Sequence, residues 1–106
     1  MAYVNSFAAL GDPTRMAVFE RLRQGPQTVG ALAAGLPVSR PAISQHLKLL
    51  KEAGLVADQA DGTRRLYRID GKGLEALKNW LISAWEEAEL AHREEIARQL
   101  EERRYG

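Results

Sequence analysis

The last third of the chain constrains the fold most, because its pattern predicts one helix over residues 71–104. A helix of roughly thirty residues is about 45 Å long at 1.5 Å per residue. So small a domain cannot bury the apolar side of such a helix, and a second copy of the chain is the simplest partner. The predicted dimer contacts on this helix recur at a spacing of three and four: Leu77, Leu81, Trp85, Ala88, His92 and Ile96.

The residues before this helix predict four short helices followed by a β-hairpin, in a single domain over residues 1–106. Asp12, Thr28 and Ser39 are residue types that cap helix starts, and Gly54 suits a left-handed helix end. An Asp-Gly pair at positions 61–62 is typical of tight hairpin turns. The expected helices cover residues 3–10, 13–24, 28–34 and 39–53, and the expected strands cover residues 55–60 and 64–69.

This order of elements is that of a winged helix-turn-helix, so the expected fold class is mostly α with a small β-hairpin wing. In the second helix we expect Met16, Phe19 and Leu22 to share the buried face, with Val18 at its edge.

The fourth helix has one apolar side and one polar side. At 100° per residue, Ile43, Leu47 and Leu50 fall within a narrow arc, and Gln45 and Lys48 lie opposite. A glutamine amide can pair with the edge of an adenine base, and a lysine can neutralise a phosphate. A solvated amphipathic helix has the same pattern, but the basic hairpin that follows favours double-stranded DNA as the partner. The predicted DNA contacts on this helix are Ser39, Arg40, Pro41, Ser44, Gln45 and Lys48.

The distribution of charge points the same way, although the net charge is only +1. Seven Lys and Arg stand against four Asp and Glu in residues 39–72, whereas residues 86–106 hold four Arg and seven Glu. A basic middle beside an acidic tail is expected of a DNA-facing surface with a solvated helix behind it. In the hairpin, Arg64, Arg65 and Arg68 are the predicted phosphate contacts. We therefore expect a DNA-binding core over residues 9–70 and a dimerisation helix over residues 71–104.

Three segments resemble the ArsR family of winged-helix repressors. They are residues 9–15 (ALGDPTR), residues 38–56 (VSRPAISQHLKLLKEAGLV) and residues 64–69 (RRLYRI). The resemblance implies a homodimer joined by its first and last helices, which adds Tyr3 and Phe7 to the dimer contacts. It also implies a repressor that binds a palindromic operator, often that of its own gene.

The chain departs from the family's pattern at two points. Pro37 stands in the turn before the fourth helix, where the family usually has glycine, so this turn must take another backbone route. The thiolate metal sensors of the family use cysteines, and this chain has none. Another sensor site of the family uses Asp, His and Glu on the last helix, paired across the dimer. Glu89, His92 and Glu95 lie on roughly one side of the last helix, but one histidine between two glutamates is a weak ligand set for zinc or nickel. We expect no metal site and no cofactor.

Two other classes of protein are weighed against this interpretation. An enzyme is disfavoured because there is no cysteine and no glycine-rich phosphate loop, and because His46 and His92 lie on different predicted helices. An antirepressor that has lost DNA binding should lack Gln45, Lys48 or the hairpin arginines, and this chain keeps them all. No signal peptide or membrane span is visible, so we expect a cytoplasmic protein without a membrane partner. The sequence does not identify an inducer or a partner protein.

Overall fold

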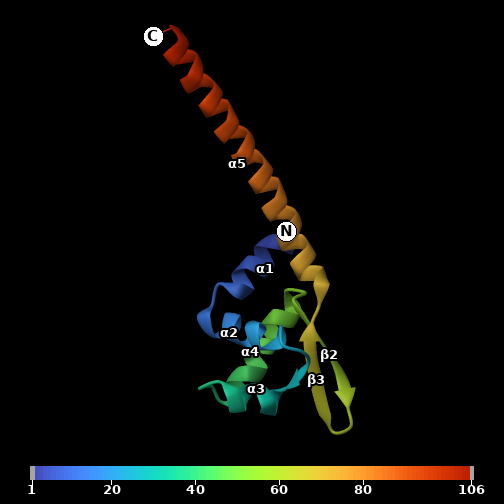
Figure 1. Cartoon of the computed structure of the whole chain (residues 1–106). Coiled ribbons are helices and arrows are strands. Elements are labelled where there is room, and N and C mark those ends of the chain that lie inside the picture. Colours follow the sequence, from blue (N-terminus) through green and yellow to red (C-terminus); the bar gives the residue numbers. More distant parts are fainter. Residues whose placement is uncertain (1, 106) are drawn as a thin grey trace.

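Five helices and three short strands make up residues 2–105, the part of the chain that this computed structural model describes (Figure 1). Their order confirms the expected class, mostly α with a small hairpin wing. The elements are α1 (Ala2–Leu10), α2 (Pro13–Leu22), β1 (Gln27–Thr28), α3 (Val29–Gly35), α4 (Arg40–Glu52), β2 (Val56–Asp61), β3 (Arg64–Ile69) and α5 (Gly71–Tyr105).

The three predicted capping side chains each accept a backbone hydrogen bond at the start of a helix. Asp12 caps α2, Thr28 caps α3 and Ser39 caps α4. These bonds satisfy N–H groups that have no partner within the first turn of a helix. The donors are the backbone N–H groups of Arg15, Ala31 and Ala42, at 2.9, 3.1 and 3.3 Å from the side-chain oxygens.

Side chains from α2, α3 and α4 meet in one core. Leu32 and the predicted arc of α4 (Ile43, Leu47 and Leu50) are fully buried. The prediction for α2 is wrong at two positions, because Val18 is fully buried whereas Met16 is 40% exposed. Because α2 packs against α1, α4 and β3, these three neighbours together determine which of its side chains are buried. Its buried side therefore differs from the single apolar face that the helical spacing of the sequence indicates.

The turn between α3 and α4 takes a route that suits proline. The N–H of Val38 donates to the carbonyl of Leu36 at 2.8 Å, which makes a three-residue turn centred on Pro37. An inverse γ-turn needs a φ near −75° at its centre, and the proline ring fixes φ close to that value. A glycine is therefore not required here.

The three strands form an antiparallel sheet in the order β1-β3-β2. Asp61 pairs with Arg64, so the hairpin loop consists of Gly62 and Thr63, one residue later than the expected Asp-Gly pair. Gly62 has φ +62°, which the first loop position of a type II′ turn requires. The two-residue strand β1 was not expected. Thr28 is extended because it caps α3, and this conformation also allows it to pair with Leu66.

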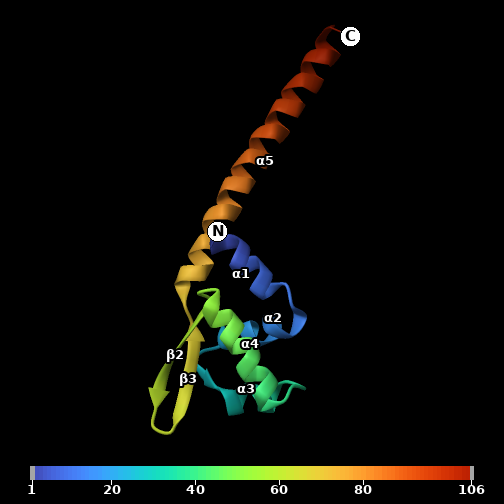
Figure 2. The same ribbon diagram turned by 180° about the vertical axis from the view of Figure 1, so that it is seen from behind.

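Figures 1 and 2 show that α5 begins beside the hairpin, passes α1 and then continues far beyond the other elements. The longest extent of the molecule is 74 Å, against 25 and 22 Å in the other two directions. Trp80 holds α1 against α5: its ring stacks on Tyr3, with centroids 6.0 Å apart, and meets the edge of Phe7 at 5.2 Å. No helix within residues 2–105 is long and apolar enough to cross a membrane.

The first turn of α5 is held close to the end of α4. The N–H of Gly73 donates to the carbonyl of Gly54 at 2.8 Å, and the hydroxyl of Ser6 lies 3.3 Å from the carbonyl of Gly73. A Cβ atom at Gly73 would stand only 2.8 Å from the Gly54 carbonyl oxygen. This close approach of two backbones fixes the direction in which α5 leaves the domain.

Candidate DNA-binding surface

The exposed side of α4 carries polar side chains that the rest of the protomer leaves free. Gln45 and Lys48 are exposed on the side opposite the buried arc, and Ser44 is exposed at the edge of that side. Within residues 2–105 none of the three side chains has a hydrogen-bond or ion-pair partner. Their donors and acceptors are therefore available to an external ligand.

Two further predicted contacts lie at the N-terminal end of α4. Ser39 Oγ accepts the N–H of Ala42, which leaves the hydroxyl proton free to donate outward. Pro41 is exposed in the first turn, where the missing N–H costs the helix no hydrogen bond.

The predicted arginines of the wing differ in their partners. Arg64 pairs with Asp61 at 3.3 Å across the hairpin turn, and both side chains are largely exposed. Arg65 donates to the carboxylate of Asp58. Arg68 is exposed and has no carboxylate partner among the described residues. The wing therefore presents one unpaired cation and two whose charge is partly compensated.

Asp58 connects the wing to α4. Its side chain is only 6% exposed and lies between Arg65 of β3 and Lys51 of α4, with Lys51 Nζ 2.7 Å from one carboxylate oxygen. The hydrogen bonds from Lys51 and then from Arg65 hold the pKa of this carboxyl below its ordinary value of 3.8. Sequence reasoning missed Asp58 and Lys51, because an acid and a base seven residues apart in different elements show no local pattern.

A pocket of about 390 Å³ lies between the start of α4 and the wing. Arg40 of α4 and both Arg64 and Arg65 of β3 line it, together with residues 28–31. The guanidinium group of Arg40 rests against Gly30, where a Cβ atom would be 3.2 Å from Nη2. The structure thus brings together three of the predicted DNA contacts.

The predicted dimer contacts do not all lie on one free surface. Leu77 is only 7% exposed and belongs to the core of its own protomer, so it has little area left for a partner. Tyr3 and Phe7 contact Trp80 within the chain, although Phe7 keeps 40% of its surface. The predicted contacts that remain accessible lie further along α5: Leu81, Trp85, Ala88, His92 and Ile96.

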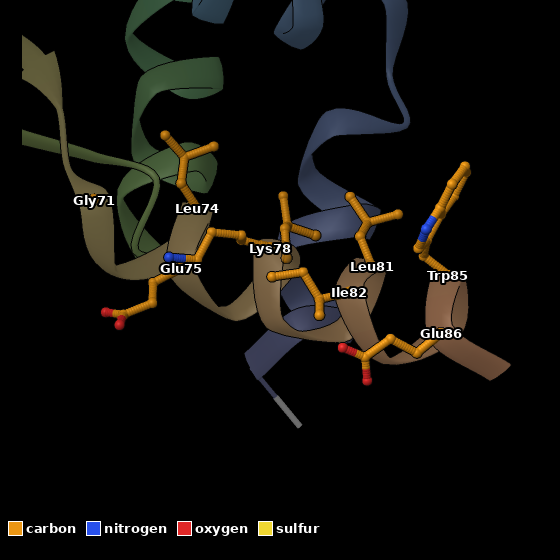
Figure 3. A pocket seen from close by; sticks show the side chains of 9 residues that line it. Gly71, Leu74, Glu75, Lys78, Leu81, Ile82, Trp85 and Glu86 are labelled. Carbon is orange, nitrogen blue, oxygen red and sulfur yellow. The ribbon is translucent and has the colours of Figure 1, made fainter. Parts of the chain in front are cut away.

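An open apolar groove runs along the first half of α5. It measures about 800 Å³, and Leu74, Leu81 and Trp85 project from the helix in the same direction along it (Figure 3). Trp85 is 71% exposed and Leu81 is 52% exposed. Large apolar side chains in such positions mark a surface suited to a protein partner.

The carboxylates that were weighed as metal ligands have other partners. Arg93 lies 2.9 Å from Glu89, and Arg98 pairs with Glu95. Within residues 2–105, no group of three or more His, Asp and Glu side chains is placed to hold a metal ion.

The comparisons with known proteins agree with this geometry. Residues 10–59 match the family described as a helix-turn-helix domain. The HTH-type transcriptional regulator Rv2034 of Mycobacterium tuberculosis is 55% identical over 83 residues, which is 78% of each chain. The transcriptional repressor SdpR of Bacillus subtilis is 34% identical over 74% of this chain and 88% of its own length.

Two solved structures show the same fold over most of the chain. An ArsR-like transcriptional regulator from Rhodococcus sp. RHA1 has a TM-score of 0.75 and 37% identity, over 91% of this chain and 92% of that one. The homodimeric winged helix-turn-helix DNA-binding domain of Mb0332 from Mycobacterium bovis has a TM-score of 0.66 and 30% identity, over 86% of this chain and 83% of that one. All four are named for transcriptional regulation or DNA binding, and the chain belongs to the ArsR family of winged helix-turn-helix transcriptional regulators and not to a family of enzymes.

Proposed function

We propose that the protein is a homodimeric repressor that binds an inverted-repeat operator, with α4 in the major groove of each half-site. The observation that carries this proposal is the free polar side of α4, where Ser44, Gln45 and Lys48 have no partner within residues 2–105. A helix presented in this way, with its other side fixed in the core, is the geometry of a recognition helix.

The residues of this surface suit different parts of the DNA. Gln45 can form two hydrogen bonds with an adenine in the major groove, which makes it the base reader. Lys48 and the hydroxyl of Ser39 suit phosphate oxygens, which position the helix without reading sequence. Arg68 on the wing is the unpaired cation best suited to neutralise a further phosphate.

The dimer is proposed to form through α1 and α5. The exposed apolar side chains of α5 continue beyond the domain, and Leu81 and Trp85 are the most exposed of those near its base. A second copy of the same helix would cover them in a two-fold symmetric interface. The names of SdpR, a repressor, and of the Mb0332 domain, a homodimer, support repression by a dimer.

The two-fold symmetry of the proposed dimer determines the spacing of the half-sites in the operator. Two copies of α4 related by a two-fold axis read two half-sites, with centres about 34–36 Å apart or a multiple of this distance. The protein would act in the cytoplasm, where a bacterial chromosome is accessible to it.

Selection of DNA fragments by the purified protein tests the proposal. We expect enrichment of one inverted repeat, protection of both half-sites in a footprint, and a mass corresponding to two chains per operator. Enrichment of a sequence without symmetry, or a single chain on the DNA, would refute the dimeric arrangement. Failure to retain any DNA would favour the antirepressor hypothesis instead.

A further inference from the structure

The chain leaves α4 through a corner, residues 53–55, that lies beside both α1 and α5 (Figures 1 and 2). Gly54 has φ +74°. Its N–H donates to the carbonyl of Lys51 at 3.0 Å, and the N–H of Leu55 donates to the carbonyl of Leu50 at 2.9 Å. These two bonds around a left-handed glycine form a Schellman motif, which ends a helix in a defined direction. The corner is therefore firmly attached to α4.

Each of the three carbonyl groups of this corner meets a donor from α1 or from the start of α5. The hydroxyl of Ser6 in α1 lies 3.4 Å from the carbonyl oxygen of Ala53. The second carbonyl accepts the N–H of Gly73 in α5 at 2.8 Å, and the third accepts the N–H of Asp70, directly before α5, at 2.9 Å. Three consecutive backbone groups after α4 are thus held by the elements that are proposed to form the dimer.

Ser6 contacts the corner and α5 at once. Its side chain is fully buried, and its Oγ atom also lies 3.3 Å from the carbonyl oxygen of Gly73. A buried hydroxyl between carbonyls of two elements favours one relative position of these elements, because a displacement would leave buried polar groups without partners. Beside it the backbones of Gly54 and Gly73 touch, since a Cβ atom at Gly73 would be 2.8 Å from the Gly54 oxygen.

The position of α4 relative to α5 determines where the DNA-facing side chains lie in the proposed dimer. The two-fold axis passes between the two copies of α5, so the distance between the two copies of α4 depends on this corner. Gln45 lies eight residues before Ala53, which is about 12 Å along the helix at 1.5 Å per residue. A rotation of α4 by about 10° would move Gln45 by about 2 Å in each copy, or about 4 Å in total, against a rise of about 3.4 Å per base pair.

We propose that this corner sets the spacing of the half-sites that the dimer accepts, and that Ser6 is the side chain that positions α4 for this spacing. The inference rests on the proposed function and adds a specificity determinant to it. Ser6 is buried within the protomer and touches no DNA. It is a positioning residue, which determines the operators that fit the dimer without changing the base contacts of α4.

Two variants change the corner in different ways. Ser6→Ala removes the hydroxyl without adding volume, so the fold should persist while the corner is held less firmly. Gly73→Ala forces the first turn of α5 away from the backbone of Gly54. Asp12→Ala is the matched control: it removes the cap of α2, which carries none of the proposed DNA or dimer contacts, and its cost in stability should be similar to that of Ser6→Ala.

The test compares the operator that the DNA selection yields with duplexes in which one base pair is added or removed between the half-sites. Each change moves one half-site by about 3.4 Å and rotates it by about 35° around the DNA axis. Fluorescence anisotropy measures binding to these duplexes and to a duplex with a single half-site. Light scattering checks that each protein is a dimer, and thermal melting gives its stability.

We expect the unmodified protein and Asp12→Ala to prefer the selected spacing by at least about tenfold. For Ser6→Ala this preference should fall below about threefold, because α4 can then adopt several angles to α5. Gly73→Ala should likewise lose the preference for the original spacing. The affinity of Ser6→Ala for a single half-site should stay within about twofold of the unmodified value, because its base contacts are unchanged. Ser6→Ala and Asp12→Ala should melt at similar temperatures.

Three outcomes would overturn the proposal while leaving the proposed function intact. In the first, both corner variants keep the full preference for the same spacing. In the second, Asp12→Ala loses the preference to the same extent, so that lower stability alone is the cause. In the third, Ser6→Ala weakens binding to a single half-site as much as to the full operator, so that Ser6 acts on base reading and not on spacing.

If Gly73→Ala does not fold, Ser6→Ala alone decides between these results. Selection of no inverted repeat, or an unmodified protein that is monomeric, would instead remove the proposed function and the spacing proposal with it.

Discussion

Lys51 at the end of α4 contacts Asp58 on β2, with 2.7 Å between Nζ and the carboxylate oxygen. The same carboxylate accepts from Arg65, so one nearly buried acid connects α4 to the strand that carries the wing arginines. Because the two strands of the wing are paired along their whole length, this contact sets the position of the entire hairpin relative to α4.

Replacement of Asp58 by Asn should therefore weaken both stability and DNA binding. We expect a decrease of about 1 kcal/mol in the free energy of unfolding, since two charge-assisted hydrogen bonds are reduced but both cations remain largely exposed. Operator affinity should fall as well, because the wing is less well positioned. Urea unfolding and anisotropy measure the two effects. Asp61→Asn is the control: its pair with Arg64 is exposed and local, so its effect on stability should be below about 0.5 kcal/mol.

The effect of Asp58→Asn should also depend on pH. The pKa of Asp58 is lowered in the folded protein, so its contribution to stability is complete above its ordinary pKa of 3.8 and is lost as the pH falls through the lower folded value. The stability difference between the two proteins should thus be constant near neutral pH and shrink in acid below 3.8. A difference that persists unchanged in strong acid would show that the Asp58 carboxylate is not the cause.

A second prediction concerns the close contact at Gly73. Gly73→Ala would place a Cβ atom 2.8–2.9 Å from the carbonyl oxygens of Gly54 and Ala53, which are backbone atoms and cannot move aside. We expect a decrease of about 2–3 kcal/mol in the free energy of unfolding, in the range typical of forced steric overlap. Gly71→Ala is the matched control, since nothing lies within 4 Å of its Cβ position. That variant should be neutral or more stable by up to about 1 kcal/mol. Equal stability of the two variants would contradict the close packing of α5 on Gly54.

Much of this fold could be predicted from local signals. The caps at Asp12, Thr28 and Ser39 and the apolar arc of α4 depend on residue types within one or two turns of a helix, and all of them are confirmed. The two-residue strand β1 could not be predicted, because Gln27 and Thr28 show no alternation and pair only once β3 is beside them.

The sequence was less informative wherever a residue's neighbours come from several elements. Val18 is buried and Met16 is exposed, the reverse of the expectation, because three elements surround α2. Leu77 fits the apolar stripe of α5 as well as Leu81 does, but the base of the helix is covered by the protomer itself and the rest is not. Asp58 was missed for the same reason, since its partners lie on α4 and β3. The assignment of individual DNA and dimer contacts stays a prediction.

A third prediction separates base reading from phosphate binding. Gln45→Ala should weaken operator binding by about 1–3 kcal/mol and relax the preference at one base pair per half-site. Arg68→Ala should weaken all sequences similarly and reduce the slope of log K against log salt by about one unit for each phosphate that is no longer neutralised. Binding to a panel of operator variants at several salt concentrations measures both effects. A uniform electrostatic weakening from Gln45→Ala, together with altered base preference from Arg68→Ala, would reverse these roles.

A fourth prediction concerns metal ions. Glu89 and Glu95 already pair with Arg93 and Arg98, so a metal ion near His92 would have to displace two arginines. We therefore expect zinc, nickel or cobalt at low micromolar concentration to leave operator affinity unchanged. Calorimetry is the direct check. Tight stoichiometric binding that disappears in His92→Ala would show that the two copies of α5 build a site that one protomer lacks.

The last prediction tests the dimer face of α5. Trp85 is 71% exposed in the protomer, so its replacement should not disturb the fold. In the proposed dimer, Trp85→Glu would remove a large apolar contact. It would also bury two glutamate carboxylates in the interface, one from each copy. We expect the dimerisation constant to weaken by on the order of 100-fold and operator affinity to fall with it.

Light scattering after size-exclusion chromatography gives the mass of Trp85→Glu, and thermal melting confirms that the protomer is folded. Ser83→Glu is the matched control: it adds the same charge to the same turn of α5, but two residues along a helix correspond to about 200° of rotation, so it lies on the far side. That variant should remain dimeric and bind the operator normally. If Trp85→Glu is also a dimer with full affinity, the exposed face of α5 is not the interface, and the dimer must form through α1 or the wing.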